Sequence, residues 1–514
     1  MKKILYKIGV LLSVVPVATL TSSCDDWFSI MPQSEMVADD FWRDEQDVQS
    51  AVGACYRAME EDGFMRRLLV WGELRSDNVI KGFTTDTDID RIQEANITSA
   101  NSYAKWGDFY TVINYCNTVI KNAPAVRERD VDFTESDLNH LLAEVKTIRA
   151  FCYFTLVRTF NNVPYIEEPY VDDTRAFTVA QTPCEAVLDT LIRDLKSVEN
   201  LAVTDYNDRI AYTRGRVTQK AVWALIADMY LWKNDYDNCV AYCDKVLKAT
   251  TNPLALVPAA SYFNSVFTRG NSDESIWELQ FDTNTRNSAL SSFYGNASSL
   301  GLLSALDFES LSGDEFWGTL DMRRIGAYAQ NGKNAIMKYV AFTYNTDYKK
   351  LSFRDFVYGS EDGHWIIYRL ADIYLMKAEA LAEMELFSEA VDMVSFTYDR
   401  ARPEQEEGSL KGLYNSLSEV RNLVFDERQR EFLFEGKRYF DIVRRIRREG
   451  NTINIVSNYL LRKYVAMSLD ENTIKSKVND PDAIYMPIHE DELRMNTLLE
   501  QNRFYKTFDN ISKN

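Results

Sequence analysis

The chain has 514 residues, of which 77 are acidic and 58 are basic, so its formal net charge is −19 at pH 7. This acidic balance argues against a protein that binds nucleic acid, because such a protein needs a basic face. Apolar residues make up 46% of the chain, enough for a large core, and with only 11 prolines and 20 glycines we find no linker at which to divide it.

The N-terminus has the order of a secretory signal. Lys2, Lys3 and Lys7 accompany a mostly apolar stretch, and small residues then lead to Cys24. A cysteine at this place is typical of a lipoprotein, in which residues 1–23 are removed and the new N-terminal cysteine carries a lipid. Such a lipid holds a protein to a membrane without crossing it. The alternative is a plain signal peptide cut nearby, with Cys24 an ordinary thiol.

Helical periodicity dominates residues 24–514, which we interpret as a single, mostly α domain. Apolar residues recur three and four positions apart, and small residues lie where two helices would touch, which is typical of tetratricopeptide-like helix pairs. Thr134 and Asp137 predict a helix N-cap. We expect four antiparallel pairs: 46–61 with 104–122, 136–160 with 183–199, 217–232 with 236–249, and 364–385 with 387–401.

Two long insertions interrupt the helical pattern, at about 76–103 and 250–360. They are rich in Ser, Thr, Asn, Gly and aromatic residues, and the second has strand-like runs at 275–279 and 335–340. Binding residues tend to lie on loops that a rigid scaffold holds in place. We therefore expect the functional residues in these two insertions.

The cysteines and histidines do not suggest a metal site or a cofactor. The three histidines are far apart in unrelated contexts, whereas a zinc site needs several close ligands. Several of the remaining cysteines fall within amphipathic helical patterns, where a thiol behaves as a small apolar group. We expect buried thiols at Cys55, Cys116, Cys152, Cys184, Cys239 and Cys243.

The acidic run at 426–431 raises the question of catalysis. In a chain with 77 acidic residues, neighbouring carboxylates are common. At helical spacing Glu427 and Glu431 share one edge and Asp426 and Arg430 share another, which is typical of an ion-paired helix. No phosphate-binding loop or serine–histidine–aspartate candidate stands out. A surface glycoside hydrolase remains an alternative, since its two carboxylates need no sequence signature.

Five segments, in this order along the chain, resemble the SusD/RagB family. The runs at 369–381 and at 426–444 (DERQREFLFEGKRYFDIVR) are close matches, and an acidic Asp25-Asp26 start after a lipid-bearing cysteine resembles a surface-export signal. The segments are 25–56, 149–164, 369–381, 426–444 and 486–502. The resemblance implies a helical fold on about four tetratricopeptide-like units and a lipid-anchored, non-catalytic protein of the outer membrane, exposed at the cell surface. It also implies a SusC-like TonB-dependent transporter as partner, to which the protein delivers an oligosaccharide or polysaccharide, less often a peptide.

Family members often place their ligand contacts in the regions of the two insertions, which gives candidates by region. Aromatic residues suit the apolar faces of sugars, and amides, acids and arginine suit their hydroxyl groups. The candidates are Asp77, Arg91, Asn101 and Tyr103 in the first insertion, and Tyr294 and Trp317, as an aromatic platform, in the second. Trp223, Trp232 and Trp277 are expected to be packed instead. The main alternative function is a protein-interaction scaffold, the usual role of tetratricopeptide folds.

Overall fold

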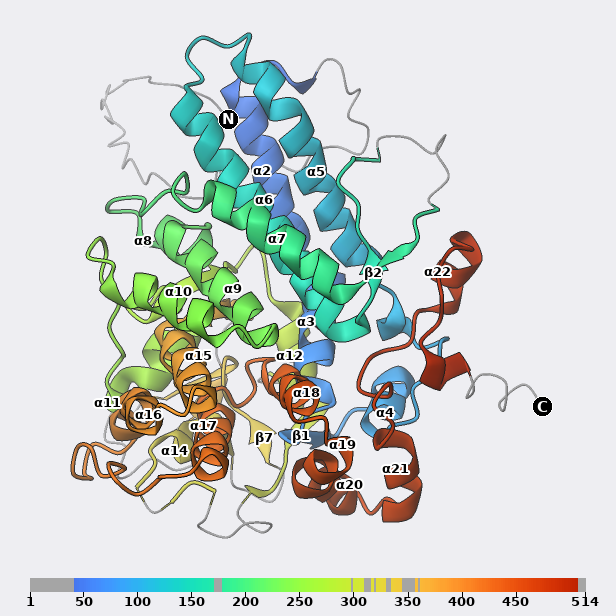
Figure 1. Cartoon of the computed structure of the whole chain (residues 1–514), viewed down its shortest axis with the longest axis vertical. Coiled ribbons are helices and arrows are strands. Elements are labelled where there is room, and N and C mark those ends of the chain that lie inside the picture. The colour runs from blue at the N-terminus through green and yellow to red at the C-terminus, as the bar shows by residue number, and fades with distance from the viewer. Residues whose placement is uncertain are drawn as a thin grey trace, which may run out of the picture.

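Antiparallel helix pairs form the main body of the protein. The computed structural model describes residues 41–170, 178–296, 299–308, 316–318, 320–329, 334–343, 356–358 and 361–506. Four pairs contact one another in chain order: α2 (Glu45–Glu60) with α5 (Gly107–Arg127), α6 (Glu135–Phe160) with α7 (Cys184–Val198), α9 (Gln219–Trp232) with α10 (Tyr236–Lys248), and α15 (Leu370–Glu383) with α16 (Phe387–Ala401). They run from α2, α5 and α6 at the top of Figure 1 to α15 and α16 at its lower left. The four predicted pairs and the mostly helical, tetratricopeptide-like fold are confirmed.

Local sequence explains where these helices begin and turn. The Thr134 hydroxyl accepts a hydrogen bond from the backbone N–H of Asp137 and so caps α6. Asn161, which ends α6, has φ 68°, and Asn234, between α9 and α10, has φ 60°. Asparagine adopts this left-handed region more readily than most residues. Glu385 makes the same kind of turn between α15 and α16, with φ 61°.

The helix predicted from residue 364 begins later. Residues Trp365–Arg369 form strand β10, and α15 starts at Leu370. The residues before Arg369 are aromatic or β-branched and pack well on a sheet, and they pair antiparallel with β4 (Ser275–Leu279). The Asp372 carboxylate then accepts the backbone N–H of Arg369 at 2.9 Å, which fixes the change from strand to helix.

The two insertions meet in one small sheet. Strand β1 (Val79–Lys81) of the first insertion pairs antiparallel with β5 (Leu303–Ala305) of the second. Two further strands of the second insertion, β7 (Ala335–Ile336) and β6 (Tyr328–Ala329), complete the order β1-β5-β7-β6. The run predicted at 335–340 is therefore a strand only in its first two residues.

Shorter elements complete the fold around the pairs. The remaining strands are β2 (Val163–Pro164) with β3 (Gln181–Thr182), and β8 (Ala341–Thr343) with β9 (Phe356–Tyr358). The remaining α-helices of the described residues are α3 (Asp62–Leu69), α4 (Thr87–Gln93), α8 (Ile210–Gly215), α11 (Ala259–Tyr262), α12 (Ser288–Tyr294), α14 (Arg323–Ala327), α17 (Leu417–Glu431), α18 (Arg438–Glu449), α19 (Thr452–Ile455), α20 (Leu461–Ala466), α21 (Glu471–Val478) and α22 (Glu490–Met495). Helices α19 to α22 lie on the right of Figure 1, beside the first insertion's α4.

A buried ion-pair network joins α17 to the second insertion and to α15. Glu431 accepts from Arg369 at 2.6 Å and from Arg323 at 2.7 Å, and all three side chains are almost fully buried. Glu427 pairs with Arg323 at 2.9 Å, and Lys338 with Glu435 at 2.7 Å. The acidic run is thus an ion-paired structural helix, as predicted, but most of its partners come from distant segments rather than from the helix itself.

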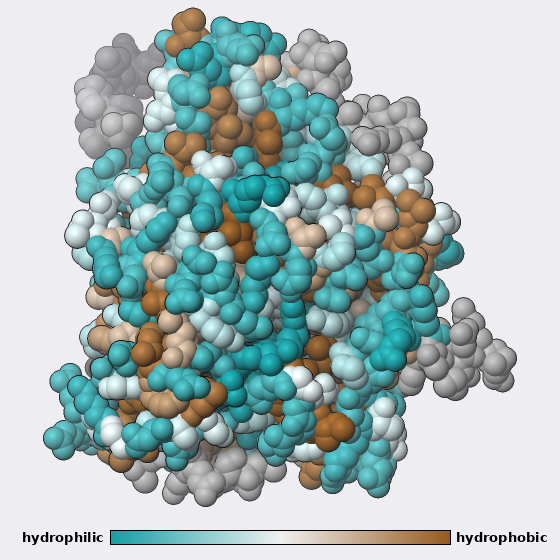
Figure 2. All heavy atoms as spheres, viewed as in Figure 1, coloured by the Kyte–Doolittle hydropathy of each residue, from teal (hydrophilic) through white to brown (hydrophobic). Residues whose placement is uncertain are grey.

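The apolar core follows the helix pairs. One cluster of buried apolar side chains extends from Trp42 to Tyr505, and a second fills the space between α15, α16 and α17. The six cysteines from Cys55 to Cys243 are free and buried, which confirms the prediction of buried thiols. On the face that Figure 2 shows, hydrophilic residues predominate and apolar residues gather in small separate patches.

Candidate ligand-binding site

The candidates in the first insertion are mostly held inside the protein. Asp77 is fully buried and ion-paired with Arg438. Asn101 is also fully buried, where its side chain accepts the backbone N–H of Tyr103 and donates to the carbonyl of Asp88. Tyr103 is 7% exposed. Of these four candidates, only Arg91, on α4, has an exposed side chain.

Tyr103 nevertheless lies where the two insertions approach each other across α3. Its hydroxyl forms a side-chain hydrogen bond with Arg66, and burial raises the pKa of Tyr103. The Arg66 guanidinium lies 5.6 Å from the centre of the Phe293 ring in the second insertion. Asp62, which pairs with Arg66, also accepts the Ser288 hydroxyl at 2.6 Å. These contacts connect the insertions through charged groups.

Tyr294 and Trp317 lie in the core. Tyr294 is 0% exposed, and its hydroxyl donates to the carbonyl of Phe434 at 2.9 Å. Trp317 is 1% exposed and packs edge-on against Phe316, and its carbonyl accepts from Arg402. An aromatic platform has to present a ring face to the ligand, and neither ring does so here. The surface platform expected from these two residues is therefore absent from this structure.

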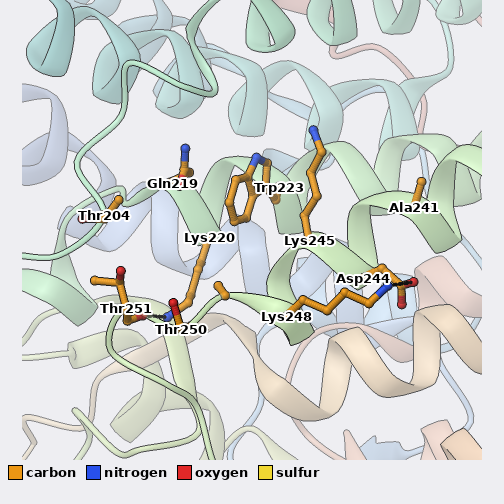
Figure 3. A pocket seen from close by; sticks show the side chains of 11 residues that line it. Thr204, Gln219, Lys220, Trp223, Ala241, Asp244, Lys245, Lys248, Thr250 and Thr251 are labelled. Carbon is orange, nitrogen blue, oxygen red and sulfur yellow. Dashed lines mark hydrogen bonds and ion pairs between the residues drawn. The ribbon is translucent and has the colours of Figure 1, made fainter.

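A pocket of about 690 Å³ opens at one end of the α9–α10 hairpin (Figure 3). The hairpin is antiparallel, so the first turns of α9 lie beside the last turns of α10, and residues three and four positions apart share a helix face. Thr204, Ala249, Thr250 and Thr251 close the pocket from neighbouring loops. The helices contribute Gln219, Lys220 and Trp223 from α9, and Ala241, Asp244, Lys245 and Lys248 from α10.

Trp223 and three lysines define the chemistry of this α9–α10 pocket. The Lys245 ammonium lies 5.8 Å from the centre of the partly exposed Trp223 ring, within the range of a cation–π contact. The Trp223 Nε1 is buried without a hydrogen-bond acceptor in the described part of the chain. Lys220 donates to the carbonyl of Thr251 at 2.6 Å, and burial lowers its pKa to about 8. Lys248 pairs with Asp244 at 2.8 Å.

A second pocket, of about 460 Å³, lies between the β2–β3 segment and the C-terminal residues. Amide side chains line it, but several of them already hold the backbone in place. Gln501 binds both the N–H and the carbonyl of Ile488, and Asn502 donates to the carbonyl of Asp482. The α9–α10 pocket, with its aromatic ring and three ammonium groups, has the richer set of groups for a ligand.

Two family models match this chain in succession. Residues 26–231 match the model described as "Starch-binding associating with outer membrane", and residues 317–505 match the model of the SusD family. The chain belongs to the SusD/RagB family. The first match ends just after Trp223 and so includes the α9 side of the pocket.

Individual SusD/RagB relatives agree with these matches. The chain is 22% identical over 464 residues to SusD-like protein P38 of Formosa agariphila, covering 82% of this chain and 88% of the relative. SusD-like protein P2 of the same organism is 25% identical over 450 residues, covering 80% and 86%.

Solved structures share the SusD/RagB fold. A SusD homolog from Bacteroides thetaiotaomicron superposes with a TM-score of 0.72 at 16% identity, covering 90% of this chain and 97% of the other. A protein described as a putative sugar binding protein, from Bacteroides vulgatus, gives 0.69 at 20% identity, with 90% and 99% coverage.

The described part of this SusD/RagB member offers neither a membrane-spanning helix nor a cluster of metal ligands. None of its described helices combines the length and apolar character that a bilayer span requires. Within the same described ranges, no three His, Cys, Asp or Glu side chains gather in a way that would hold a metal ion.

Sequence reasoning did not find the pocket of this SusD/RagB protein. It assigned Trp223 to the packed interior together with Trp232 and Trp277, and those two are buried as expected. Trp223 also packs against the core, but it is only partly buried and lines the pocket, where Lys220, three residues earlier, shares its helix face. A tryptophan and a lysine on the same face of an otherwise apolar helix are the sequence pattern that could have indicated this pocket.

Proposed function

We propose that the protein captures a glycan at the outer membrane and delivers it to a SusC-like TonB-dependent transporter, without catalysing a reaction. The observation that carries this proposal is the pair of family matches, one of them to a model described as starch-binding and associating with the outer membrane. The neighbour described as a putative sugar binding protein supports the same ligand class.

In this proposal the α9–α10 pocket contributes to glycan binding. The Trp223 ring offers a face for the C–H groups of a sugar, and Gln219, Thr204 and Thr250 offer groups for its hydroxyls. An aromatic contact contributes about 0.5–1.5 kcal/mol and a hydrogen bond about 1 kcal/mol net. After association costs, two or three of each give roughly micromolar to millimolar affinity. This strength suits a protein that must also release its cargo.

The predicted insertion residues remain part of the proposal only where they can reach a ligand. Arg91 is exposed, and Tyr103 lies beside Arg66 where the insertions meet. Asp77, Asn101 and the pair Tyr294 and Trp317 would need to leave their buried positions first. Lipid attachment at Cys24, which lies outside the described residues, would hold the protein at the outer-membrane surface.

Calorimetric titration of the purified protein against a panel of neutral and acidic polysaccharides and peptides, with product analysis of each mixture, tests the proposal. Saturable binding of a glycan without new products is the expected result. Trp223→Ala should weaken that binding, and Tyr115→Ala, which changes an exposed ring on α5, should not. Glycan cleavage would instead identify a surface hydrolase. Binding of peptides alone would favour the protein-interaction scaffold.

Delivery requires a second measurement. Detergent-solubilised outer membranes should yield the protein together with a TonB-dependent transporter in stable stoichiometry. Recovery of the protein without any transporter, from cells that express both, would contradict the delivery role while leaving glycan capture intact.

A further inference from the structure

The α9–α10 pocket is cationic in a protein that is strongly anionic. Three lysines and one aspartate line it, whereas the whole chain carries a net charge of −19. In physiological salt, exposed charges more than about 8 Å apart are largely screened from each other. A ligand inside the pocket therefore responds mainly to the charges that line it, and these are mostly positive.

Lys220 is the lysine with the least compensation. Its ammonium donates to the carbonyls of Thr251 and Asn252, and it forms no ion pair with a carboxylate in the described ranges. Asp205 and Arg214 are close enough to act on it electrostatically, with opposite effects on its pKa. Burial lowers the pKa of Lys220 to about 8, so its ammonium is still mostly protonated and charged at pH 7.

Both pocket lysines of α10 are ion-paired, but only Lys248 shares its carboxylate with another lysine. Lys245 pairs with Glu199 at 2.8 Å, and Glu199 also accepts the Tyr242 hydroxyl. Asp244 is shared between Lys248 and Lys377, at 2.8 and 2.5 Å. Lys245 is therefore balanced by Glu199, whereas Asp244 is shared by two lysines and Lys220 has no carboxylate partner in the described ranges. The excess positive charge of the pocket comes from Lys220 and from this sharing of Asp244.

The aromatic ring stands among these charges. In Figure 3 Trp223 lies between Lys220 and Lys245. Its ring is partly exposed, and its indole N–H has no acceptor among the described residues. An anionic group can bind an ammonium while the ring to which it is attached packs against the indole. Ammonium groups bind carboxylates and sulfate-like oxyanions through strong charge-assisted hydrogen bonds.

We propose that the α9–α10 pocket selects an acidic sugar, with the sugar ring against Trp223 and its carboxylate or sulfate oxygens at Lys220 and the neighbouring lysines. This inference rests on the proposed function for the ligand being a glycan, and it adds the charge of that glycan. The ligands that would fit share one feature, an oxyanion carried on a pyranose ring. A uronic acid and a sulfate ester are its two sources.

Two matched pairs of oligosaccharides distinguish the effect of the acidic group on affinity from that of the sugar ring itself. The first pair is a galacturonic acid tetrasaccharide and its methyl ester, and the second is a sulfated galactose tetrasaccharide and its desulfated form. Calorimetry with the purified protein should show at least one acidic member binding about tenfold or more tighter than its neutral counterpart, a difference of about 1.4 kcal/mol. The pair with the larger ratio identifies the source of the oxyanion. The preference should shrink as salt is raised, because ions screen the attraction.

Lysine variants locate the selectivity. Lys220→Gln and Lys248→Gln should each reduce the acidic-over-neutral ratio several-fold. Lys248 has a 76% exposed side chain, so its variant tests charge with little risk to folding, whereas Lys220 holds the backbone of residues 251 and 252. Lys121→Gln, on the exposed surface of α5, is the matched control and should leave the ratio unchanged.

The possible failures are distinguishable. Equal affinity within both pairs, or acidic binding that neither lysine variant changes, would overturn the acidic preference, and glycan capture would still stand. Binding of the neutral oligosaccharides alone would also overturn the acidic preference and leave glycan capture intact. If no oligosaccharide of either pair and no polysaccharide of the wider panel bound, both the acidic preference and the glycan-binding function would fall.

Discussion

Asp77 and Arg438, 361 residues apart in the sequence, form a buried two-point ion pair, with Nε to Oδ1 at 2.8 Å and Nη2 to Oδ2 at 3.2 Å. Arg462 binds the same carboxylate. Burial alone would raise the pKa of Asp77, but the charges of these two arginines outweigh it and hold that pKa well below its usual range. The start of the first insertion is thereby fixed to α18 and α20.

We expect Asp77→Asn to destabilise the protein by about 3–5 kcal/mol, because it removes one partner and leaves buried cationic charge uncompensated. The free energy of unfolding in urea measures this loss. Asp189→Asn, which breaks an exposed pair with Lys233, is the control and should cost at most about 1 kcal/mol. Normal stability combined with weaker glycan binding would restore Asp77 as a ligand contact.

Tyr294→Phe tests whether the predicted platform residue is structural. The variant loses the hydroxyl that binds the carbonyl of Phe434, a residue with φ 65°. A buried carbonyl left without its donor costs about 1–3 kcal/mol, and we expect a loss of stability in that range with unchanged glycan affinity. Tyr115→Phe, at an exposed ring, should change neither quantity. A clear loss of affinity in the folded Tyr294→Phe protein would show that this residue does reach the ligand.

The helix pairs were predictable because their signals are local. The apolar spacing of α6, the cap at Thr134 and the turn at Asn234 are all contained within a few residues. The strand Trp365–Arg369 was missed because an apolar run joined to a helix fits both structures until its partner, β4, is known.

The candidate site was less predictable because its decisive contacts are distant in sequence. Polar and aromatic residues in an insertion suit a ligand loop and a buried ion-paired loop equally, and only the position of Arg438 distinguishes the two for Asp77. The α9–α10 pocket likewise depends on how Lys245 and the residues after α10 lie against Trp223. The apolar pattern of α9 alone does not contain that information.

Cys24→Ala tests the lipid anchor that the signal-like N-terminus predicts. Without the thiol no lipid can be attached, so the purified variant should move from the detergent phase to the aqueous phase in phase partitioning. Ser23→Ala keeps the cysteine and a small residue before it, and should stay in the detergent phase. An intact Cys24→Ala protein that still entered the detergent phase by itself would contradict lipidation at this residue.

Acid should unfold the protein steeply, because the buried carboxylates that are paired with arginine or lysine, such as Glu427 and Glu435, are ionised in the folded state. Burial alone would raise the pKa of Glu427 and of Glu435, but Arg323 and Arg430 near the first, and Arg369 and Lys338 near the second, lower both pKa values to about 2. An unfolded glutamate has a pKa of about 4.3. Since the folded-state pKa values are depressed, their contribution to stability is complete above about pH 4.3 and is lost as the pH falls towards 2.

The free energy of unfolding, measured in urea from pH 7 to pH 2.5, should therefore decline below about pH 4.5. Each such carboxylate contributes up to about 1.4 kcal/mol per pH unit to the slope. Glu427→Gln lowers stability at pH 7 because Arg323 and Arg430 lose a partner. In acid, however, the free energy of unfolding of this variant should fall less steeply with pH, because one fewer carboxylate takes up a proton. Glu471→Gln, at an exposed carboxylate on α21, is the control. An acid slope that Glu427→Gln leaves unchanged would mean that this glutamate does not carry a buried charge, and the ion-paired account of α17 would have to be abandoned.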